Sequence, residues 1–200
     1  MTKTYSKTRI LVEGALMIAL STVLSMIQIP LMPHGGSITL FSMVPILVMS
    51  YRHGAKWGIM TAFVNSLIQL VQGLGNLAYC QTLTAQVGCV LLDYLLAFTV
   101  LGFACLIAKP FRRRTVGLLR FLCSFLSGYI VWKDYDYAFS WMTEIGFPGI
   151  SNMSVDGLCW LYSAVYNATY MLPEAILTTV LVVILIRVAP QIFDPQNARA

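Results

Sequence analysis

Long apolar runs constrain this chain more than any other feature of its sequence. Residues 83–108 read LTAQVGCVLLDYLLAFTVLGFACLIA and contain one charged side chain, that of Asp93. A helical run of about 20 apolar residues spans the hydrocarbon core of a bilayer. The whole chain is 58% hydrophobic and only 10% charged, whereas a soluble domain has about 25% charged residues. The sequence therefore predicts an integral membrane protein.

We predict an all-α membrane protein with six transmembrane helices, folded as one domain over residues 1–200. Residues 38–51 are short for a complete span, so we expect neighbouring helices to shield them in part. We expect the stretch 133–160 to be a loop. The six apolar segments are 10–29, 38–51, 56–73, 83–108, 115–132 and 161–188.

The basic residues predict the orientation. Six spans place the N-terminus, the turns 52–56 and 109–114 and the C-terminus on one side of the membrane. Most Lys and Arg residues fall in these segments, whereas the loops of the other side contain only Lys133. The positive-inside rule then predicts that both termini are cytoplasmic. The formal net charge of +5 thus reflects topology, and we do not read it as nucleic-acid binding.

Catalytic and cofactor motifs are absent from the sequence. It has no G-x-x-x-x-G-K-[ST] motif for ATP, and its two His and five Cys residues do not follow a metal-ligand spacing. No Ser–His, His–Cys or paired-carboxylate arrangement is evident. We therefore expect neither an enzyme nor a bound metal or cofactor.

Polar side chains concentrate at one depth in four of the predicted helices, on the side opposite to the termini. Isolated interhelical hydrogen bonds contribute about 0.6 kcal/mol each, so such groups can simply hold a bundle together. Their convergence at one depth instead favours a pocket. The polar groups are Asn65, Gln69 and Gln72; Gln86 and Asp93; Ser124 and Ser127 with Trp132; and Tyr162, Ser163, Tyr166, Asn167 and Tyr170.

Asp93 decides between these interpretations. A carboxylate near the centre of a membrane costs about 2.5–3.5 kcal/mol and by default marks a functional site or an ion pair. Arg120 is the nearest candidate partner by composition, but we expect it to lie closer to the cytoplasm. The aromatic rings, amides and single carboxylate suit a small, flat, partly cationic molecule. The stretch 133–160 either covers this pocket or forms an interfacial aromatic belt.

Two further features concern the first segment. Ala15 and Ala19, beside Gly14, form a small-xxx-small face, which serves either internal packing or the docking of another subunit. Glu13 lies near the predicted cytoplasmic end, within reach of Arg9, and we interpret it as structural.

Taken together, several segments resemble the thiamine-specific substrate-binding subunits of bacterial energy-coupling factor (ECF) transporters. The resemblance covers nearly the whole chain. It rests on LVEGALMIALSTVLS, GGSITLFSMVPILVMSYRHGAKWG, LLDYLLAFTVLGFA, RFLCSFLSGYIVW and LYSAVYNATYMLPE.

The resemblance implies a six-helix subunit that binds a vitamin in its outer half and docks to a module of one transmembrane subunit and two ATPases. It assigns Ala15 and Ala19 to contact with that transmembrane subunit. It also places the loop from His34 to Ser37 over the site. The binding residues that it implies are Asp93, Tyr94, Trp132, Tyr162 and Asn167.

Other readings stay open at this stage. Asp93 stands where the family usually has Glu, and Ser124 where it usually has His, so a thiamine precursor, an analogue or another small vitamin is an alternative ligand. A different class is a stand-alone carrier driven by protons or sodium, with Asp93 or Glu174 as the coupling carboxylate. The six predicted helices of this chain show no evident inverted repeat, which argues against a stand-alone carrier.

Overall fold

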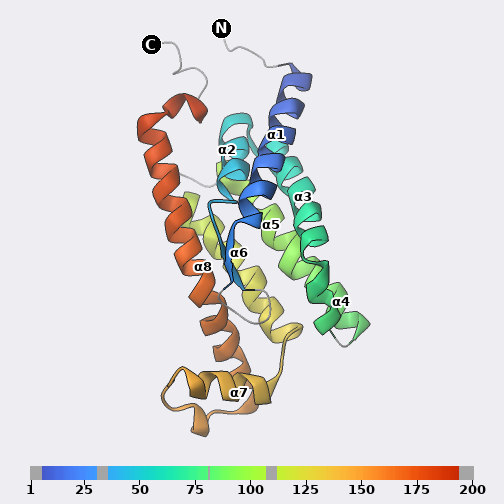
Figure 1. The fold of residues 1–200 in the computed structure, drawn as a ribbon, viewed down its shortest axis with the longest axis vertical. Coiled ribbons are helices and arrows are strands. Elements are labelled where there is room, and N and C mark those ends of the chain that lie inside the picture. Colours follow the sequence, from blue (N-terminus) through green and yellow to red (C-terminus); the bar gives the residue numbers. More distant parts are fainter. Residues whose placement is uncertain (1–5, 31–35, 81, 107–111, 194–200) are drawn as a thin grey trace.

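The computed structural model describes residues 6–30, 36–80, 82–106 and 112–193. Within these ranges the fold is helical apart from one two-stranded hairpin (Figure 1). The major elements are α1 (Lys7–Met26), β1 (Gln28–Pro30), β2 (Ser37–Thr39), α2 (Val44–His53), α3 (Ala55–Gln72), α6 (Arg112–Ile130), α7 (Tyr135–Glu144) and α8 (Val155–Val188). Between α3 and α6 lie η1 (Leu74–Tyr79), α4 (Leu83–Cys89), η2 (Val90–Leu96), α5 (Ala97–Thr99) and η3 (Val100–Leu106), while η4 (Ile150–Asn152) precedes α8 and η5 (Pro190–Ile192) follows it.

The helices run lengthwise along the molecule, and α7 lies across one end (Figure 1). We call this the α7 end. α1 begins and α8 finishes at the opposite end, which we call the termini end. This arrangement agrees with an even number of crossings, but which end faces the cytoplasm stays a prediction.

The candidate spans are fewer than six in the part of the chain that the structure describes. Three helical stretches are long and apolar enough to cross a bilayer: Lys7–Met26, Leu83–Leu106 and Val155–Val188. A fourth is possible if Val116–Ile130 and Tyr135–Glu144, bent by 120° at their junction, count as one broken span. The prediction of an all-helical fold is confirmed, whereas the prediction of six spans is not established.

α2 is an apolar helix that is shorter than a complete span. Its 10 residues reach about 15 Å at 1.5 Å per residue, half the thickness of the hydrocarbon core. Every residue from Val44 to Ser50 is buried. The helix therefore forms the centre of the main core, with Met43, Ala62, Leu101, Ala104, Val116 and Val182 around it.

Small residues allow the central helices to approach closely. A Cβ atom on Gly58 would lie 2.7 Å from Cα of Ser50, and one on Gly102 would lie 2.5 Å from Cα of Ile59. The Ser50 hydroxyl donates to the carbonyl of Gly102 (2.7 Å) and accepts from the N–H of Cys105 (3.0 Å). Backbones thus pack directly against one another, as small residues allow in membrane proteins.

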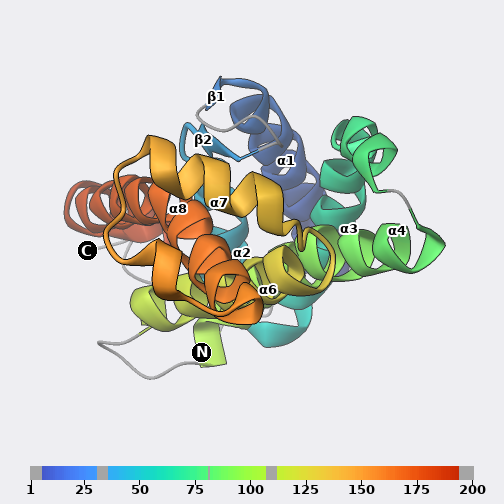
Figure 2. The ribbon, with the colours of Figure 1, turned by 90° about the horizontal axis from the view of Figure 1, so that it is seen from below.

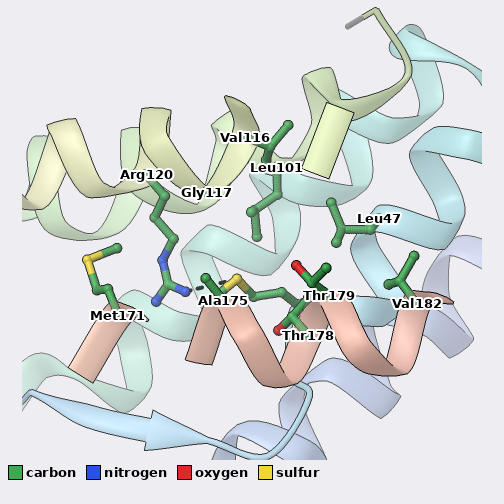
Figure 3. Close-up of a pocket in the computed structure, with 11 residues that line it drawn as sticks. Leu47, Leu101, Val116, Gly117, Arg120, Met171, Ala175, Thr178, Thr179 and Val182 are labelled. Carbon is green, nitrogen blue, oxygen red and sulfur yellow. Dashed lines mark hydrogen bonds between the residues drawn. The ribbon is translucent and has the colours of Figure 1, made fainter. Parts of the chain in front are cut away.

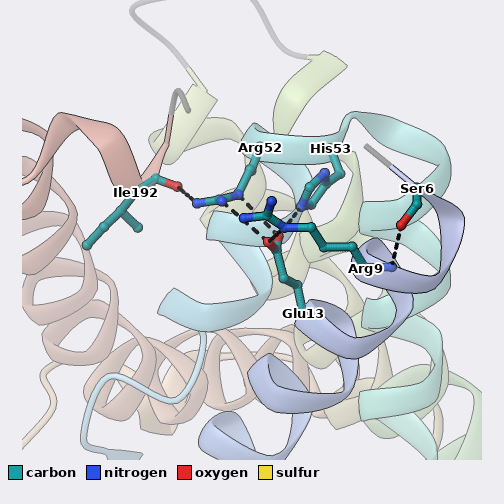
Figure 4. Close-up of polar contacts among 6 residues, drawn as sticks. All are labelled: Ser6, Arg9, Glu13, Arg52, His53 and Ile192. Atoms are coloured by element: carbon teal, nitrogen blue, oxygen red, sulfur yellow. Dashed lines mark hydrogen bonds and ion pairs between the residues drawn. The ribbon is translucent and has the colours of Figure 1, made fainter. Parts of the chain in front are cut away.

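An ion cluster holds the termini end together (Figure 4). Glu13 of α1 contacts Arg9 (3.2 Å), Arg52 (3.2 Å) and His53 (2.6 Å), the last two from the end of α2. Arg52 also donates to the carbonyl of Ile192 in η5 (3.2 Å). The contact between Glu13 and Arg9 was expected, and the structure adds the link to α2 and η5.

The stretch 133–160, expected to be a loop, contains the helix α7. The Asp134 side chain caps α7 by accepting from the N–H of Tyr137. The Ser154 side chain caps α8 in the same way, accepting from the N–H of Gly157. α8 consequently begins six residues before the predicted start at Leu161. The expectation of a loop is therefore wrong for Tyr135–Glu144 and for the first turns of α8.

Candidate ligand-binding site

Asp93 lies on a widened turn of its helix. Residues Val90–Leu96 form a π-helical segment, a local distortion that is common at functional sites. The Asp93 carboxylate accepts hydrogen bonds from the Ser127 hydroxyl (2.7 Å) and from the indole N–H of Trp132 (3.0 Å), both supplied by the end of α6 or just beyond it. Asp93 is only partly buried. Among the described residues it forms no ion pair, since both donors are neutral.

α6 and α8 meet beside this carboxylate. The Asn167 amide donates to the carbonyls of Ser124 (3.2 Å) and Ser163 (2.9 Å), and the Ser163 hydroxyl donates to the carbonyl of Phe125 (2.6 Å). The contact requires glycine at position 128, because a Cβ atom there would lie 2.2 Å from Oγ of Ser163. The predicted residues Ser124, Ser163 and Asn167 are thus brought together. Ser124 takes part through its backbone carbonyl and not through its side chain.

A row of aromatic rings follows α8 from the α7 end toward Asn167. Tyr162 lies 5.4 Å from Tyr166, and Tyr166 lies 6.1 Å from Tyr170, between ring centroids. The Tyr170 hydroxyl donates to Oδ1 of Asn167 (2.7 Å). Aromatic rings and the Asn167 amide thus lie at the same depth along α8.

Tyr94 and Gln86 make their polar contacts elsewhere. The Tyr94 hydroxyl donates to the carbonyl of Gly73 (3.0 Å) and accepts from the Asn76 amide (3.0 Å). The Gln86 amide donates to the carbonyl of Cys80 (3.3 Å). Both side chains therefore tie helices to the segment that follows α3, although Tyr94 also packs in the apolar cluster that includes Trp132. Their assignment to ligand binding stays a prediction.

α3 contributes polar atoms that lack a partner. Oδ1 of Asn65 and Nε2 of Gln69 are buried, and neither has a hydrogen-bond partner in the part of the chain that the structure describes. Buried polar atoms are normally satisfied by protein, water or ligand. Gln69 was predicted as a binding residue, and its unsatisfied amide is consistent with that prediction. His34, the remaining predicted binding residue, lies outside the described residues.

A second buried carboxylate, that of Glu174, is neutralised within the protein. Glu174 forms an ion pair with Arg120 (2.9 Å) and accepts a hydrogen bond from Thr39 of β2. Arg120 also stacks over the ring of Phe98, at 4.7 Å. Arg120 therefore pairs with Glu174, in agreement with the expectation that it lies away from Asp93. The pairing depends on how α6 and α8 are rotated against each other, which the order of residues in the chain does not specify.

Figure 3 shows a cleft near Arg120 between α2, η3, α6 and α8. Its volume is about 40 Å³, whereas small-molecule sites occupy roughly 300–1,000 Å³. None of the predicted binding residues lines it, and we do not assign it to the ligand. The lining residues are Met43, Leu47, Leu101, Val116, Gly117, Arg120, Met171, Ala175, Thr178, Thr179 and Val182.

Residues 11–194 match the family model described as Thiamine transporter protein (Thia_YuaJ). The chain belongs to the thiamine transporter family. The chain is 30% identical over 193 residues to the thiamine transporter ThiT of Bacillus subtilis (strain 168), and the match covers 94% of this chain and 95% of that relative. It is 24% identical over 198 residues to ThiT of Lacticaseibacillus paracasei, covering 96% of this chain and 93% of that one.

The fold of the family is likewise shared. A solved structure of ThiT from Listeria monocytogenes superposes with a TM-score of 0.64 at 19% identity, covering 94% of this chain and 98% of that chain. The predicted resemblance is confirmed at the level of the family. Membership identifies a transporter and not an enzyme, and a multi-pass protein of the bacterial cell membrane.

The stretch 133–160 was expected either to cover the pocket or to form an aromatic belt, but the helix α7 was not predicted. Trp141 contacts Tyr162 and Tyr166 from a segment that was expected to be a loop. The sequence does carry a signal for α7, because Asp134 is a good N-cap residue and the apolar Ala138 and Met142 follow four residues apart.

Proposed function

We propose that this protein is the membrane-embedded thiamine-binding subunit of an ECF-type importer. The observation that carries the proposal is the environment of Asp93, a partly buried carboxylate held by neutral donors beside the indole of Trp132. Thiamine has a flat cationic thiazolium ring joined through a methylene group to a flat pyrimidine ring, so a carboxylate and aromatic faces match its charge and its rings. Membership in the family, with relatives named thiamine transporters, supports the same ligand.

The site opens away from the cytoplasm in this proposal. Both termini and the ion cluster around Glu13 then lie on the cytoplasmic side, and α7 lies on the outer side. The distribution of Lys and Arg supports this orientation. Six crossings require α2 to cross the membrane together with the chain on either side of it, because α2 alone is shorter than a span. The burial of α2 behind its neighbours is compatible with this arrangement.

Docking to a partner is assigned to α1. Ala15 and Ala19 are exposed, whereas Gly14, on the face of α1 that packs against neighbouring helices, is buried. The small-residue face thus points outward and is available to another helix, which supports subunit docking over internal packing. The proposed partners are one transmembrane subunit and two ATPases, because the chain has no ATP-binding loop of its own.

Equilibrium binding of labelled thiamine by the purified, detergent-solubilised chain tests the ligand. We expect saturable binding at submicromolar concentration. Tighter binding of the separate pyrimidine or thiazole half would instead assign a precursor as the ligand, and no binding of any of the three would overturn the proposed substrate.

Uptake into vesicles separates the subunit from a stand-alone carrier. We expect uptake only when the transmembrane subunit and both ATPases are present with ATP. The double variant Ala15→Leu, Ala19→Leu should bind thiamine with unchanged affinity but should no longer support uptake. Uptake by the chain alone, driven by a proton or sodium gradient, would contradict the proposal and favour an ion-coupled carrier.

A further inference from the structure

α7 is a folded part of the α7 end and is packed firmly against α8. Ala138 and Met142 on its inner face are fully buried, as is Leu158 at the start of α8. Figure 2 shows α7 crossing the end of the bundle in front of α8. Lys133 pairs with Asp156, and this contact raises the pKa of the Lys133 ammonium. The ion pair and the Asp134 cap fix the point at which the chain turns from α6 into α7.

The inner face of α7 places an indole on the tyrosines of the candidate site. The Trp141 ring lies 5.6 Å from the ring of Tyr162 and 5.9 Å from that of Tyr166, in edge-on geometry in both cases. Tyr137, one turn earlier, lies 5.9 Å from Tyr162. Trp141 therefore extends the row of rings that continues through Tyr170 to Asn167.

The orientation of α7 argues against a role as a membrane-surface anchor. An interfacial helix turns its apolar face toward lipid and its polar face toward water. Here the buried face is apolar and aromatic, whereas the exposed positions include Asp136, Ser140, Thr143 and Glu144. The apolar side of α7 thus serves the protein interior.

We propose that α7 is the outer wall of the binding site and that Trp141 is a further ligand-contacting residue, which slows ligand release. The inference rests on the proposed function, because it takes Tyr162 and Tyr166 to line the site. A ring that already contacts both tyrosines is placed to cover one side of a flat cation bound beside them. Aromatic faces attract such cations most strongly when water is excluded, and the inner face of α7 is fully buried at Ala138 and Met142.

The test replaces Trp141 in the full-length chain and measures the affinity for thiamine and its dissociation rate with labelled ligand. Trp141→Leu keeps apolar volume and removes the ring, and Trp141→Phe keeps a smaller ring. We expect Trp141→Leu to weaken binding about tenfold, mainly through faster dissociation, and Trp141→Phe to weaken it about threefold. Labelled thiamine is preferable to tryptophan fluorescence because the substitution removes one of the fluorophores.

Tyr135→Ala is the matched control. Its ring lies on the same helix but stacks on Phe139 at 6.0 Å, so its loss should leave affinity and dissociation unchanged. Thermal unfolding in detergent reports whether each variant folds. Unchanged binding and dissociation in both Trp141 variants, in a chain that binds thiamine, would overturn this inference and leave the proposed function intact. No binding by the unsubstituted chain would overturn the proposed function and this inference together.

Discussion

Asp93 and Glu174 are both carboxylates within apolar helical segments, but their surroundings differ. Glu174 is 1% exposed and pairs with Arg120 at 2.9 Å. Asp93 is partly accessible and is held by the hydroxyl of Ser127 and the indole of Trp132. Arg120 therefore neutralises the charge of Glu174 within the protein. The Asp93 carboxylate is positioned by neutral donors and stays accessible to a cationic ligand.

From this difference we infer that Glu174 is a structural carboxylate and that Asp93 is a ligand-binding one. A buried ion pair adds little net stability compared with apolar residues, but removing one partner leaves a charge uncompensated and is costly. A carboxylate without a cationic partner inside the membrane is a functional candidate by default. We therefore expect substitutions at Glu174 to affect folding and substitutions at Asp93 to affect binding.

Glu174→Gln should produce the largest effect on stability. It leaves the largely buried Arg120 guanidinium without its counter-charge, which typically costs about 3–5 kcal/mol for a fully buried pair. Thermal unfolding in detergent should show a clear decrease in Tm. The double variant Arg120→Met, Glu174→Leu removes both charges and should recover most of the loss. Equal destabilisation in the single and double variants would contradict a structural ion pair.

Asp93→Asn should cause the largest loss of affinity. Removing the charge while keeping the shape removes the attraction to a cationic ligand, with an expected cost of about 2 kcal/mol or more, or roughly 30-fold in Kd. Tm should change little, because the two donors can still bond to the amide oxygen. Titration calorimetry with thiamine measures the loss. Wild-type affinity in this variant would remove Asp93 from the site.

Gly128→Ala tests the contact between α6 and α8 on the side of Asp93. The added methyl would overlap Oγ of Ser163, and overpacking typically costs about 1–3 kcal/mol. We expect lower Tm and about tenfold weaker thiamine binding, because Asn167 and Ser163 move with α8. Gly117→Ala on the same helix is the control, since its methyl would lie 4.0 Å from the nearest atom. Equal effects at both positions would show that any methyl on α6 disturbs the fold.

Ser127→Ala and Thr39→Val should produce the smallest effects, on different quantities. Ser127 donates to Asp93 and Thr39 donates to Glu174, and a single hydrogen bond contributes about 1 kcal/mol. We expect Ser127→Ala to weaken thiamine binding several-fold at nearly constant Tm. Thr39→Val should lower Tm slightly and leave Kd unchanged. A loss of Tm in Ser127→Ala together with a loss of affinity in Thr39→Val would contradict the distinction between the two carboxylates.

Individual residues show how far the sequence could predict the site. Asp93, Trp132 and Asn167 were predicted as binding residues from the cost of a charge in a membrane, from helical periodicity and from the resemblance to the family, and the structure places them near one another. Glu174 lies on the same polar stripe of its helix as Asn167, so periodicity could not separate their roles. Its ion pair with Arg120 also depends on the distance between two helices. Trp141 was not singled out as a binding residue, because the stretch 133–160 was expected to be a loop that either covers the pocket or forms an interfacial belt.

The sequence by itself determined that this protein is helical, lies in a membrane and places polar groups together along its helices. These conclusions follow from composition and from the 3.6-residue period, which concern one helix at a time. Only the tertiary structure decided that α2 is buried in the core, that α7 covers the tyrosines of α8, and that Arg120 pairs with Glu174, so that none of the described residues supplies a counter-charge to Asp93. These contacts depend on the rotation and depth of one helix against another, which are set by close packing at small residues such as Gly128.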